Sequence, residues 1–438
     1  MRWKETEYSG WGRALFATAS LTRPERAAQL AAIATDTPAP AIGQRRSYGD
    51  AALCSGGRAV DMTRLDRVID FDAETGVVSV EAGTQIGDLG HAFAARGWIP
   101  PVMPGTGFAT VGGCIANDVH GKNHHHLGSF GQHVTEITLL QGGKTRTLSP
   151  TKNADLFKAT VGGLGQTGII AEARLQLMPC KGDMMVLTER RIDDWDEHIA
   201  ALDASQATYT VGWIDATAKG DALGRGILEE GEITSGISPT SGKAKEVPFD
   251  APGWALSAPV VRLFNEAYFR RVPASGRTSV KPIAAPFFPL DKIHNWNRLY
   301  GKRGFHQFQC VVPLAAADML RAMLERIANS GLASPLAVLK RMGAGRAGFL
   351  SFPMEGYTLA VDFPNRGAVA ALYADLERMT AEAAGRIYFA KDALAQGTDL
   401  PVMYPELEAW RKQVAKADPE GHYITDLVRR LGLREERA

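Results

Sequence analysis

The sequence has no long apolar run, few cysteines and no excess of charge of either sign. No apolar stretch approaches the ~18 residues that a membrane-spanning helix needs, and the first ten residues, MRWKETEYSG, lack the apolar core of a signal peptide. The four cysteines form no C-x-x-C pair and show no zinc spacing, which indicates free thiols in a reducing compartment. We therefore expect a cytoplasmic protein; contact with the periphery of the inner face of a membrane stays open.

The charge balance argues against nucleic acid as a partner. The 49 basic and 48 acidic residues give a net charge of +1, which produces no long-range field to gather phosphates. A chain of 438 residues is too long for one ordinary core, so two or three domains are expected. With 45% hydrophobic and 22% charged residues, the composition is that of a globular protein, and it favours a small-molecule enzyme.

Apolar periodicity and turn residues predict a first series of elements. Thr22 and Glu25, three residues apart, have the pattern of a capping box for an amphipathic helix over 22–34. The pair Gly142-Gly143 between two alternating segments predicts a hairpin. We further expect strands at 77–82 and 169–177, and helices at 86–96 and 153–160.

Two longer stretches differ from this pattern. Residues 99–131 are rich in Gly, His and Pro and have no sustained period, and an irregular stretch of that length inside a compact domain is usually functional. Residues 219–254 are rich in Gly, Ser, Pro and charge. We interpret them as a mobile loop, because patterned segments flank them on both sides.

The stretch 305–391 alternates strands and helices in the order β-α-β-β-α-β. This order is typical of the ferredoxin-like, or split βαβ, arrangement with an antiparallel sheet. Gly331 and Gly385 stand where the two helices are expected to stop. Two short helices are expected over 404–433.

Residues 163–168, GLGQTG, have the form G-x-G-x-x-G. A Rossmann motif of this form follows a strand, opens a helix and has an acidic residue ~20 positions later. Here a helix precedes the glycines, a β-branched strand follows them, and no such acidic residue is present. We therefore exclude a nicotinamide site of that type. The glycines still permit close approach of a ligand, with a simple tight turn as the alternative.

Five of the ten histidines fall between residues 120 and 133. A metal site would need His120 and His124 on one helical face, and Gly121 between them argues against such a helix. We therefore expect no metal; a loop that lines a cofactor explains both the small and the polar residues. The segment RSYGD at 46–50 can cradle phosphate through backbone amides, hydroxyls and an arginine, with a structural turn as the alternative.

Three positions near the end of the chain can contact a substrate. Gln307 and Gln309 lie two apart on a strand and share one face, where their amides suit hydroxyl groups; an exposed polar face is the alternative. Lys391 follows an apolar strand, where a buried ammonium can stabilise a developing anion, whereas a surface lysine is the commoner case.

The order of these motifs along the chain is more specific than any one of them. From about Arg46 to Leu433, the segments RSYGD, GTGFATVGGCIANDVHGKNHHHLGSFGQHV, ATVGGLGQTGII, YFAKD and MYPELEAW follow one another. The chain thus resembles the FAD-linked oxidases of the vanillyl-alcohol oxidase or p-cresol methylhydroxylase (PCMH) type. It is most similar to the branch that oxidises polyprenylphosphoryl ribose.

The resemblance implies an α+β protein with a split, two-subdomain FAD-binding domain of the PCMH type. Residues 1–185 and 386–438 would form that domain, and residues 186–385 would form a ferredoxin-like, antiparallel-sheet substrate domain. Several relatives carry a histidine on the first phosphate loop that links covalently to the flavin. Arg46 stands at that position here, which predicts non-covalent FAD.

The resemblance also assigns site residues. Lys391, His120 and Tyr48 would be catalytic, and Lys122, Gln307, Gln309, Lys340 and Thr358 would contact the substrate. The FAD-binding residues would be Arg46, Ser47, Tyr48, Gly49, Gly105, Thr106, Thr110, Gly112, Gly113, Asn117, His120, Gly163, Gly168, Ile169, Tyr388 and Lys391.

The implied reaction is hydride transfer to flavin N5 from a secondary sugar hydroxyl, the 2-hydroxyl of a polyprenyl-phosphate-linked pentose, as the first half of an epimerisation. A short-chain reductase would be the partner that completes it. Two alternatives stay open: an aldonolactone or alditol oxidase acting on a free sugar, and a catalytically silent flavin-binding subunit. Thr358 and Ala360 replace an asparagine and a cysteine usual on the substrate strand, and Arg45 replaces a glycine of the first loop.

Overall fold

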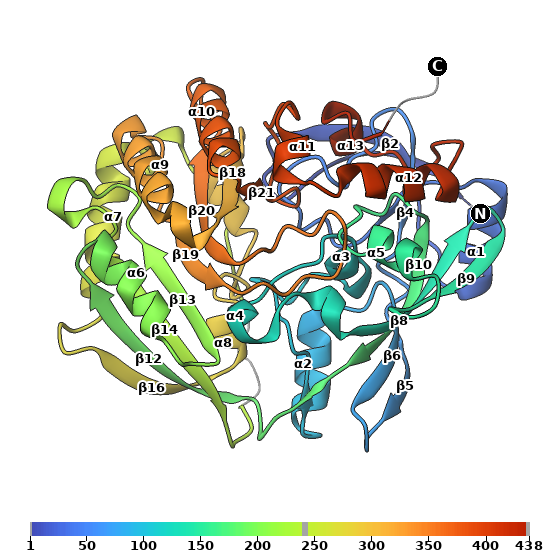
Figure 1. Cartoon of the computed structure of the whole chain (residues 1–438), viewed down its shortest axis with the longest axis horizontal. Coiled ribbons are helices and arrows are strands. Elements are labelled where there is room, and N and C mark those ends of the chain that lie inside the picture. Colours follow the sequence, from blue (N-terminus) through green and yellow to red (C-terminus); the bar gives the residue numbers. More distant parts are fainter. Residues whose placement is uncertain (1, 239–243, 435–438) are drawn as a thin grey trace.

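The computed structural model describes residues 2–238 and 244–434, which form two β-sheet bodies side by side (Figure 1). The first body holds a five-stranded antiparallel sheet and a smaller four-stranded sheet. In spatial order the larger sheet consists of β5 (Val68–Asp72), β6 (Val77–Glu81), β10 (Ile169–Gln176), β8 (Val134–Gln141) and β9 (Lys144–Leu148). The smaller consists of β1 (Lys4–Ser9), β2 (Phe16–Thr22), β4 (Arg58–Asp61) and β3 (Ala41–Ile42).

The second body is an eight-stranded sheet whose neighbouring strands all run antiparallel. Its elements from 305 onward follow the predicted order β-α-β-β-α-β. The strands, in spatial order, are β16 (Arg277–Pro282), β12 (Met184–Ile192), β14 (Gly226–Thr234), β13 (Tyr209–Ile214), β19 (Ala337–Met342), β20 (Gly356–Pro364), β18 (Phe305–Val312) and β21 (Arg386–Ile387).

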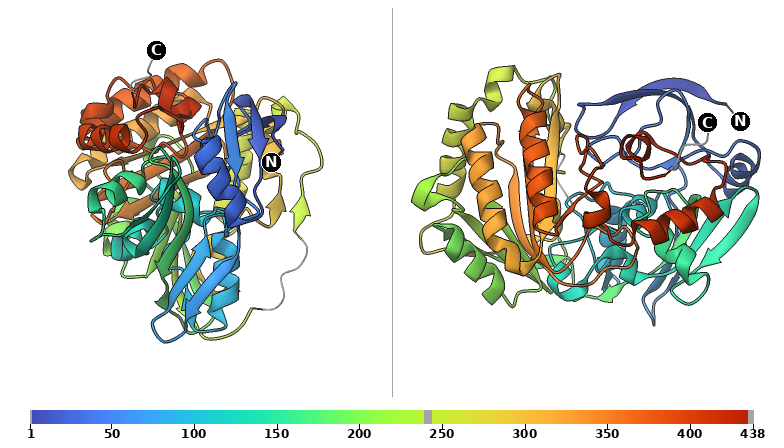
Figure 2. Two further views of the ribbon diagram at one scale, coloured as in Figure 1. Left: turned by 90° about the vertical axis from the view of Figure 1, so that its right-hand side faces the viewer. Right: turned by 45° about the horizontal axis from the view of Figure 1, so that its top comes forward.

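Three helices cover one face of this sheet: α6 (Trp195–Ala204), α9 (Ala317–Ser330) and α10 (Val369–Glu382) (Figure 2, right). Strand alternation explains the arrangement, because Phe308 and Cys310 of β18 join the core under these helices. Gln307 and Gln309 of the same strand therefore point to the opposite face, toward the first body.

The chain returns to the first body after β21. There α12 (Leu407–Ala417) packs beside α5 (Ala154–Thr160), and the Trp410 indole donates to the Ala159 carbonyl at 3.2 Å. Figure 1 shows α11 (Leu400–Met403), α12 and α13 (Asp426–Arg430) above the sheets of this body. The assignment of residues 1–185, 186–385 and 386–438 to domains stays a prediction.

Most predicted elements are present, including the hairpin β8–β9, whose Gly142 and Gly143 both have positive φ. The capping box at Thr22 is wrong, since the helix α1 is Ala27–Asp36 with Arg26 at its N-cap. Thr22 instead ends β2, where it pairs with Val60 of β4, so strand pairing overrides the local capping pattern.

The mobile loop predicted at 219–254 is also wrong in its first half. Residues 226–234 form β14, which pairs with β12 along its whole length and with β13 over 226–231. Part of the remainder, 239–243, lies outside the described residues. In the described parts of the chain, no helix combines the length and apolarity needed to cross a bilayer.

The irregular stretch 99–131 contains short helices, α3 (Val111–Ala116) and α4 (His124–Leu127). Gly331 ends α9 with a positive φ, as expected. At the end of α10, however, Ala384 takes the left-handed conformation and Gly385 does not. A Cβ on Gly385 would lie 2.4 Å from the Val311 carbonyl oxygen, so this glycine is needed for close approach and not for its φ.

Candidate active site

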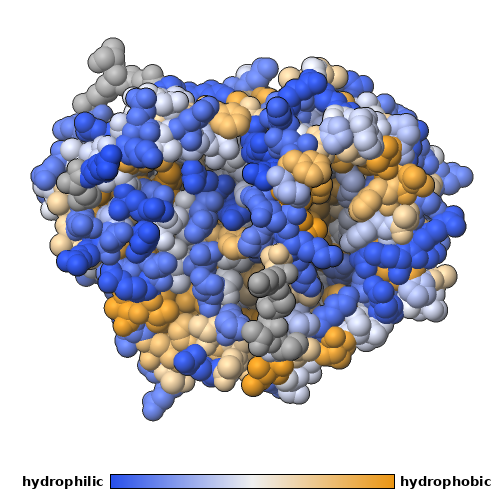
Figure 3. All heavy atoms as spheres, turned by 180° about the vertical axis from the view of Figure 1, so that it is seen from behind, coloured by the Kyte–Doolittle hydropathy of each residue, from blue (hydrophilic) through white to orange (hydrophobic). Residues whose placement is uncertain are grey.

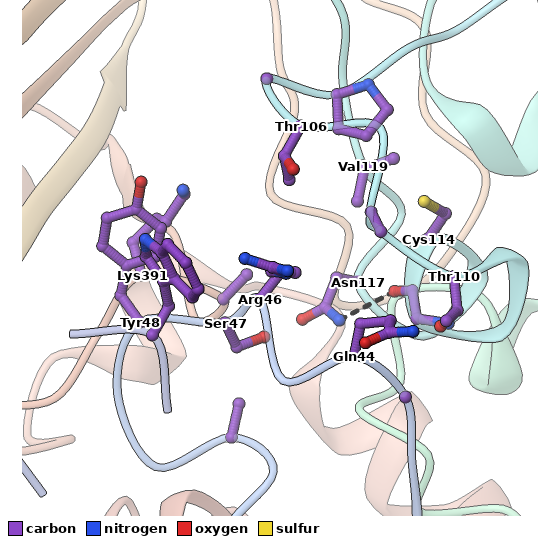
Figure 4. Close-up of a pocket in the computed structure, with 18 of the residues that line it drawn as sticks. Gln44, Arg46, Ser47, Tyr48, Thr106, Thr110, Cys114, Asn117, Val119 and Lys391 are labelled. Carbon is purple, nitrogen blue, oxygen red and sulfur yellow. Dashed lines mark hydrogen bonds between the residues drawn. The ribbon is translucent and has the colours of Figure 1, made fainter. Parts of the chain in front are cut away.

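A cavity of about 370 Å³ lies between the two bodies and collects most of the residues singled out in the sequence. Its walls come from the loop 41–52, the stretch 103–122, the face of the eight-stranded sheet opposite the helices, and residues 388–391. Figure 4 shows part of this wall, with Arg46 between Thr106 and Ser47. The cavity is thus built by segments that are hundreds of residues apart.

Arg46 is held between two aromatic rings. Its guanidinium carbon lies 4.2 Å from the centre of the Trp11 ring and 4.5 Å from that of Phe108. Burial lowers the pKa of Arg46, and Asp291 opposes that effect. Its Nε is buried without a hydrogen-bond partner among the described residues, so a donor is left for a ligand.

Asn117 presents an unsatisfied acceptor on the same wall. Its Nδ2 donates to the Gly113 carbonyl at 2.9 Å (Figure 4), whereas its Oδ1 is buried with no partner among the described residues. Gly105 and Gly165 line the cavity, and a Cβ on either would meet nothing within 4 Å. Bare backbone, an orphaned donor and an orphaned acceptor fit a flat, polar cofactor such as FAD.

Three lysines converge on the part of the cavity next to the sheet. Lys391 Nζ lies 3.6 Å from the centre of the Tyr48 ring. Lys122 Nζ donates to the Pro286 carbonyl at 2.6 Å, and it lies 3.8 Å from a Glu229 carboxylate oxygen. Burial, with Lys122 and Lys391 nearby, lowers the pKa of Lys340 to about 7. This part of the cavity therefore favours an anion.

His120 is the hub of a hydrogen-bond network between the two bodies. Its Nδ1 lies 3.0 Å from Lys340 Nζ, and its Nε2 lies 3.0 Å from Gln309 Nε2. Burial, followed by the charge of Lys340, lowers the pKa of His120 well below its usual value, so the imidazole is neutral. A neutral ring has one donor and one acceptor nitrogen, so it can accept a hydrogen bond from only one of these two partners, Lys340 or Gln309.

Sequence comparisons agree with this geometry. Residues 19–149 match the FAD binding domain family. The chain is 37% identical to decaprenylphosphoryl-beta-D-ribose oxidase of Mycolicibacterium smegmatis, over 97% of each chain. The chain belongs to the decaprenylphosphoryl-β-D-ribose oxidase family. It is an FAD-dependent oxidoreductase of α+β architecture.

Sugar-lactone enzymes are more distant relatives of this family member. L-Gulono-1,4-lactone dehydrogenase of Mycobacterium tuberculosis is 22% identical over 97% of this chain and 98% of its own. A putative D-arabinono-1,4-lactone oxidase of Neurospora crassa is 32% identical, over only 36% of this chain and 29% of its own. The second match covers 165 aligned residues and leaves most of both proteins unaligned.

The structure brings together most of the predicted site residues of this FAD-dependent oxidoreductase. Those that line the cavity are Arg46, Ser47, Tyr48, Gly105, Thr106, Thr110, Gly112, Gly113, Asn117, His120, Lys122, Gly168, Gln307, Gln309, Lys340, Thr358, Tyr388 and Lys391. Their individual roles stay predictions.

Three predicted FAD-binding residues do not line the cavity. A Cβ on Gly49 would lie 1.8 Å from the Asp392 carbonyl oxygen, and one on Gly163 would lie 1.8 Å from that of Ala159. Both glycines therefore serve close contacts within the protein. Ile169 is wholly buried in the core, and strand alternation places its neighbour Ile170 on the cavity wall instead.

Asp362 is a site residue that the sequence reasoning missed. It is wholly buried on β20, accepts hydrogen bonds from the Gln307 amide and, at 2.9 Å, from the Tyr300 hydroxyl, and thereby fixes the Gln307 side chain. Burial raises the pKa of Asp362 and lowers that of Lys391, and each charge opposes the shift of the other. A lone acid in the apolar strand YTLAVDF is the signal that marks it.

Asp291 was missed as well. Its carboxylate accepts from the Thr106 hydroxyl at 2.8 Å and from the Gly107 backbone N–H at 2.7 Å, which ties the irregular stretch to the second body. No motif marks this residue in the sequence.

Two further histidines of the 120–133 segment, His124 and His125, contact the second body. His124 Nδ1 accepts from the Gly343 backbone N–H at 3.1 Å, and His125 Nε2 lies 3.1 Å from the Ala207 carbonyl oxygen. Within residues 2–238 and 244–434, no three metal-ligating side chains are grouped to hold an ion.

Proposed function

We propose that this protein oxidises the 2-hydroxyl of a pentose linked through phosphate to a polyprenyl chain. The convergence of Lys122, Lys340 and Lys391 in one part of the cavity carries this proposal. A free sugar has no charge to match such a cluster, whereas a phosphodiester-linked sugar does. The printed name of the M. smegmatis relative supports the same substrate class.

Bound FAD would supply the hydride acceptor, and the chain's own residues would orient the sugar. Arg46 and Asn117 would hold polar groups of FAD with the orphaned atoms described above, and Tyr388 would close the cavity near His120. Gln307 and Gln309 would hydrogen-bond the sugar hydroxyls. Lys391 would stabilise negative charge on the substrate oxygen as its proton leaves.

The second candidate is oxidation of a free sugar lactone. The full-length similarity to L-gulono-1,4-lactone dehydrogenase favours it, as do Thr358 and Ala360 in place of the residues usual on the substrate strand. A direct comparison decides between them. The holoenzyme is given a short-chain prenylphosphoryl ribofuranoside, L-gulono-1,4-lactone or D-arabinono-1,4-lactone, and the rate of flavin reduction is measured.

We expect kcat/KM for the phosphorylated sugar to exceed that for either lactone by at least about 100-fold, the value of one or two charge-assisted hydrogen bonds. Equal or faster reduction by a lactone would establish the second candidate. A short-chain reductase would be the partner that consumes the keto sugar.

We propose, further, that FAD is bound non-covalently in a split PCMH-type domain, because Arg46 occupies the position of a flavin-linking histidine. Acid precipitation tests this point. The flavin absorbance should move to the supernatant; flavin that stays in the pellet would show a covalent link.

A further inference from the structure

Helix α7 (Ala258–Arg270) has two apolar faces, although it lies on the surface of the second body. Val261 and Phe269 are buried on one face. On the other, Val260, Leu263 and Phe264 are exposed at i, i+3 and i+4 spacing, with Leu263 72% exposed. A surface helix normally presents polar residues to water, so an apolar outer face needs a partner.

Trp254, just before the helix and 70% exposed, extends this face. We call Trp254, Val260, Leu263 and Phe264 the α7 surface. Figure 3 shows apolar side chains toward the right margin of the rear view, the side on which α7 lies. An exposed tryptophan beside aliphatic and aromatic residues is typical of a helix at a membrane interface.

The α7 surface adjoins a wall of the cavity. The segment 245–251 runs along 292–298: β15 (Lys245–Glu246) pairs with β17 (Ile293–His294), and the Ala251 N–H donates to the Arg298 carbonyl at 2.9 Å. Exposed Phe249 lies on the first segment and exposed Leu299 directly follows the second, and Trp296 of the second segment lines the cavity. The surface and the cavity therefore share one piece of structure.

Exposed cations lie on α7 and on the neighbouring part of the chain. Arg262 and Arg270 are exposed on α7, where Arg270 pairs with Glu266, and Lys302 and Arg303 are exposed shortly after residues 292–298. The acid Asp250 is surrounded by positive charge, since Arg13, Arg298 and Lys302 all lower its pKa. Such a rim matches anionic lipid headgroups, and it would repel the same surface of a second copy.

We propose that the α7 surface docks this protein on an anionic bilayer, with its apolar residues in the headgroup region and the cationic rim against the headgroups. The docked protein then draws its substrate from the membrane. Only this last step rests on the proposed function, because a polyprenyl-linked sugar is held in the bilayer by its lipid chain.

Vesicle cosedimentation of the FAD-loaded protein tests the proposal. We expect binding to phosphatidylglycerol/phosphatidylcholine vesicles, weaker binding to phosphatidylcholine alone, and release by salt. The double variant Leu263→Ser/Phe264→Ser should bind about tenfold less or weaker still, because two side chains lose their apolar burial. Ile69→Ser is the matched control: Ile69 is 50% exposed on β5 of the first body, and its variant should bind like the parent chain.

Two results on vesicle binding would overturn the proposal: no binding of the parent chain to anionic vesicles, or equal binding of the double variant. A third would be a parent chain that is a dimer and a double variant that is a monomer, with vesicle binding unchanged. Flavin reduction by a water-soluble, short-chain substrate should be unchanged in the double variant. Failure of that reduction in the parent chain would instead contradict the proposed function and leave the docking surface standing.

Discussion

Lys391 combines a half-buried side chain with a nearby countercharge. The side chain lies over the Tyr48 ring, and Asp362 is the group that opposes the loss of its charge. We expect Lys391→Ala to slow anaerobic flavin reduction by at least about 100-fold while FAD stays bound, because stabilisation of the substrate oxygen is lost. Stopped-flow absorbance measures the rate, and the flavin-to-protein ratio measures retention. Lys152→Ala, at an exposed turn, is the control, and near-native reduction by Lys391→Ala would contradict the role.

Lys340 predicts a pH dependence. Its pKa is lowered to about 7, so the ammonium is present below that pH and lost as the pH rises through it. For a phosphate-bearing substrate, kcat/KM should therefore fall by up to about tenfold for each pH unit above about pH 7. Lys340→Met should lower kcat/KM at about pH 6 and remove this limb of the profile. If kcat/KM of Lys340→Met still fell above about pH 7, the fall would be due to the titration of another group.

Residue types and strand alternation sufficed to place Gln307 and Gln309 together on the cavity face. They did not suffice for Asp362 or Asp291, whose importance comes from partners distant in sequence: Tyr300 for the first and Thr106 for the second. The resemblance predicted that Ile169 binds FAD because of its place in a motif. In the structure its side chain points into the core, because successive residues along a strand face opposite sides.

Helix α13 is anchored by hydrogen bonds to both loops that carry site motifs. Arg430 donates to both carboxylate oxygens of Asp50, at 2.7 and 2.8 Å, and to Asp392 at 2.9 Å. Asp50 ends the RSYGD motif and Asp392 ends YFAKD, so one arginine holds both loops in place. Arg430→Ala would leave two buried carboxylates without their cation.

We expect Arg430→Ala to lower the free energy of unfolding by about 3 kcal/mol, the usual effect of removing one partner of a buried ion pair. Urea denaturation measures it. The control Arg378→Ala breaks an exposed pair with Glu382 and should change the free energy by less than about 0.5 kcal/mol. Equal effects of the two variants would show that the Arg430 network does not fasten α13.

The elements that were predicted correctly are those with a strong local signal, such as the hairpin at Gly142-Gly143 and the helix that Gly331 ends. Two errors have one physical cause. Thr22 and the residues of β14 have local sequences that favour a cap and a loop, but pairing with neighbouring strands satisfies their backbone groups instead. Such long-range pairing is not visible in a local pattern.

The active site lies where the two bodies meet, and both bodies contribute residues to it. His120 comes from the first body, and it contacts Lys340 and Gln309 of the second. Residue patterns within each body predicted candidates, and the resemblance predicted that they form one site. The relative placement of β18, β19 and the loop at 120 depends on packing between the bodies, which no local pattern encodes.

Oxidation of a sugar through FAD bound in this cavity is the proposed activity. Its most direct test is anaerobic mixing of the purified holoenzyme with a short-chain prenylphosphoryl ribofuranoside, with the flavin absorbance followed and the product identified by NMR. We expect the oxidised flavin band to disappear with one equivalent of sugar and one equivalent of the 2-keto sugar to form. A flavin band that neither this substrate nor any sugar lactone bleaches would contradict the claim and identify a catalytically silent flavin-binding subunit.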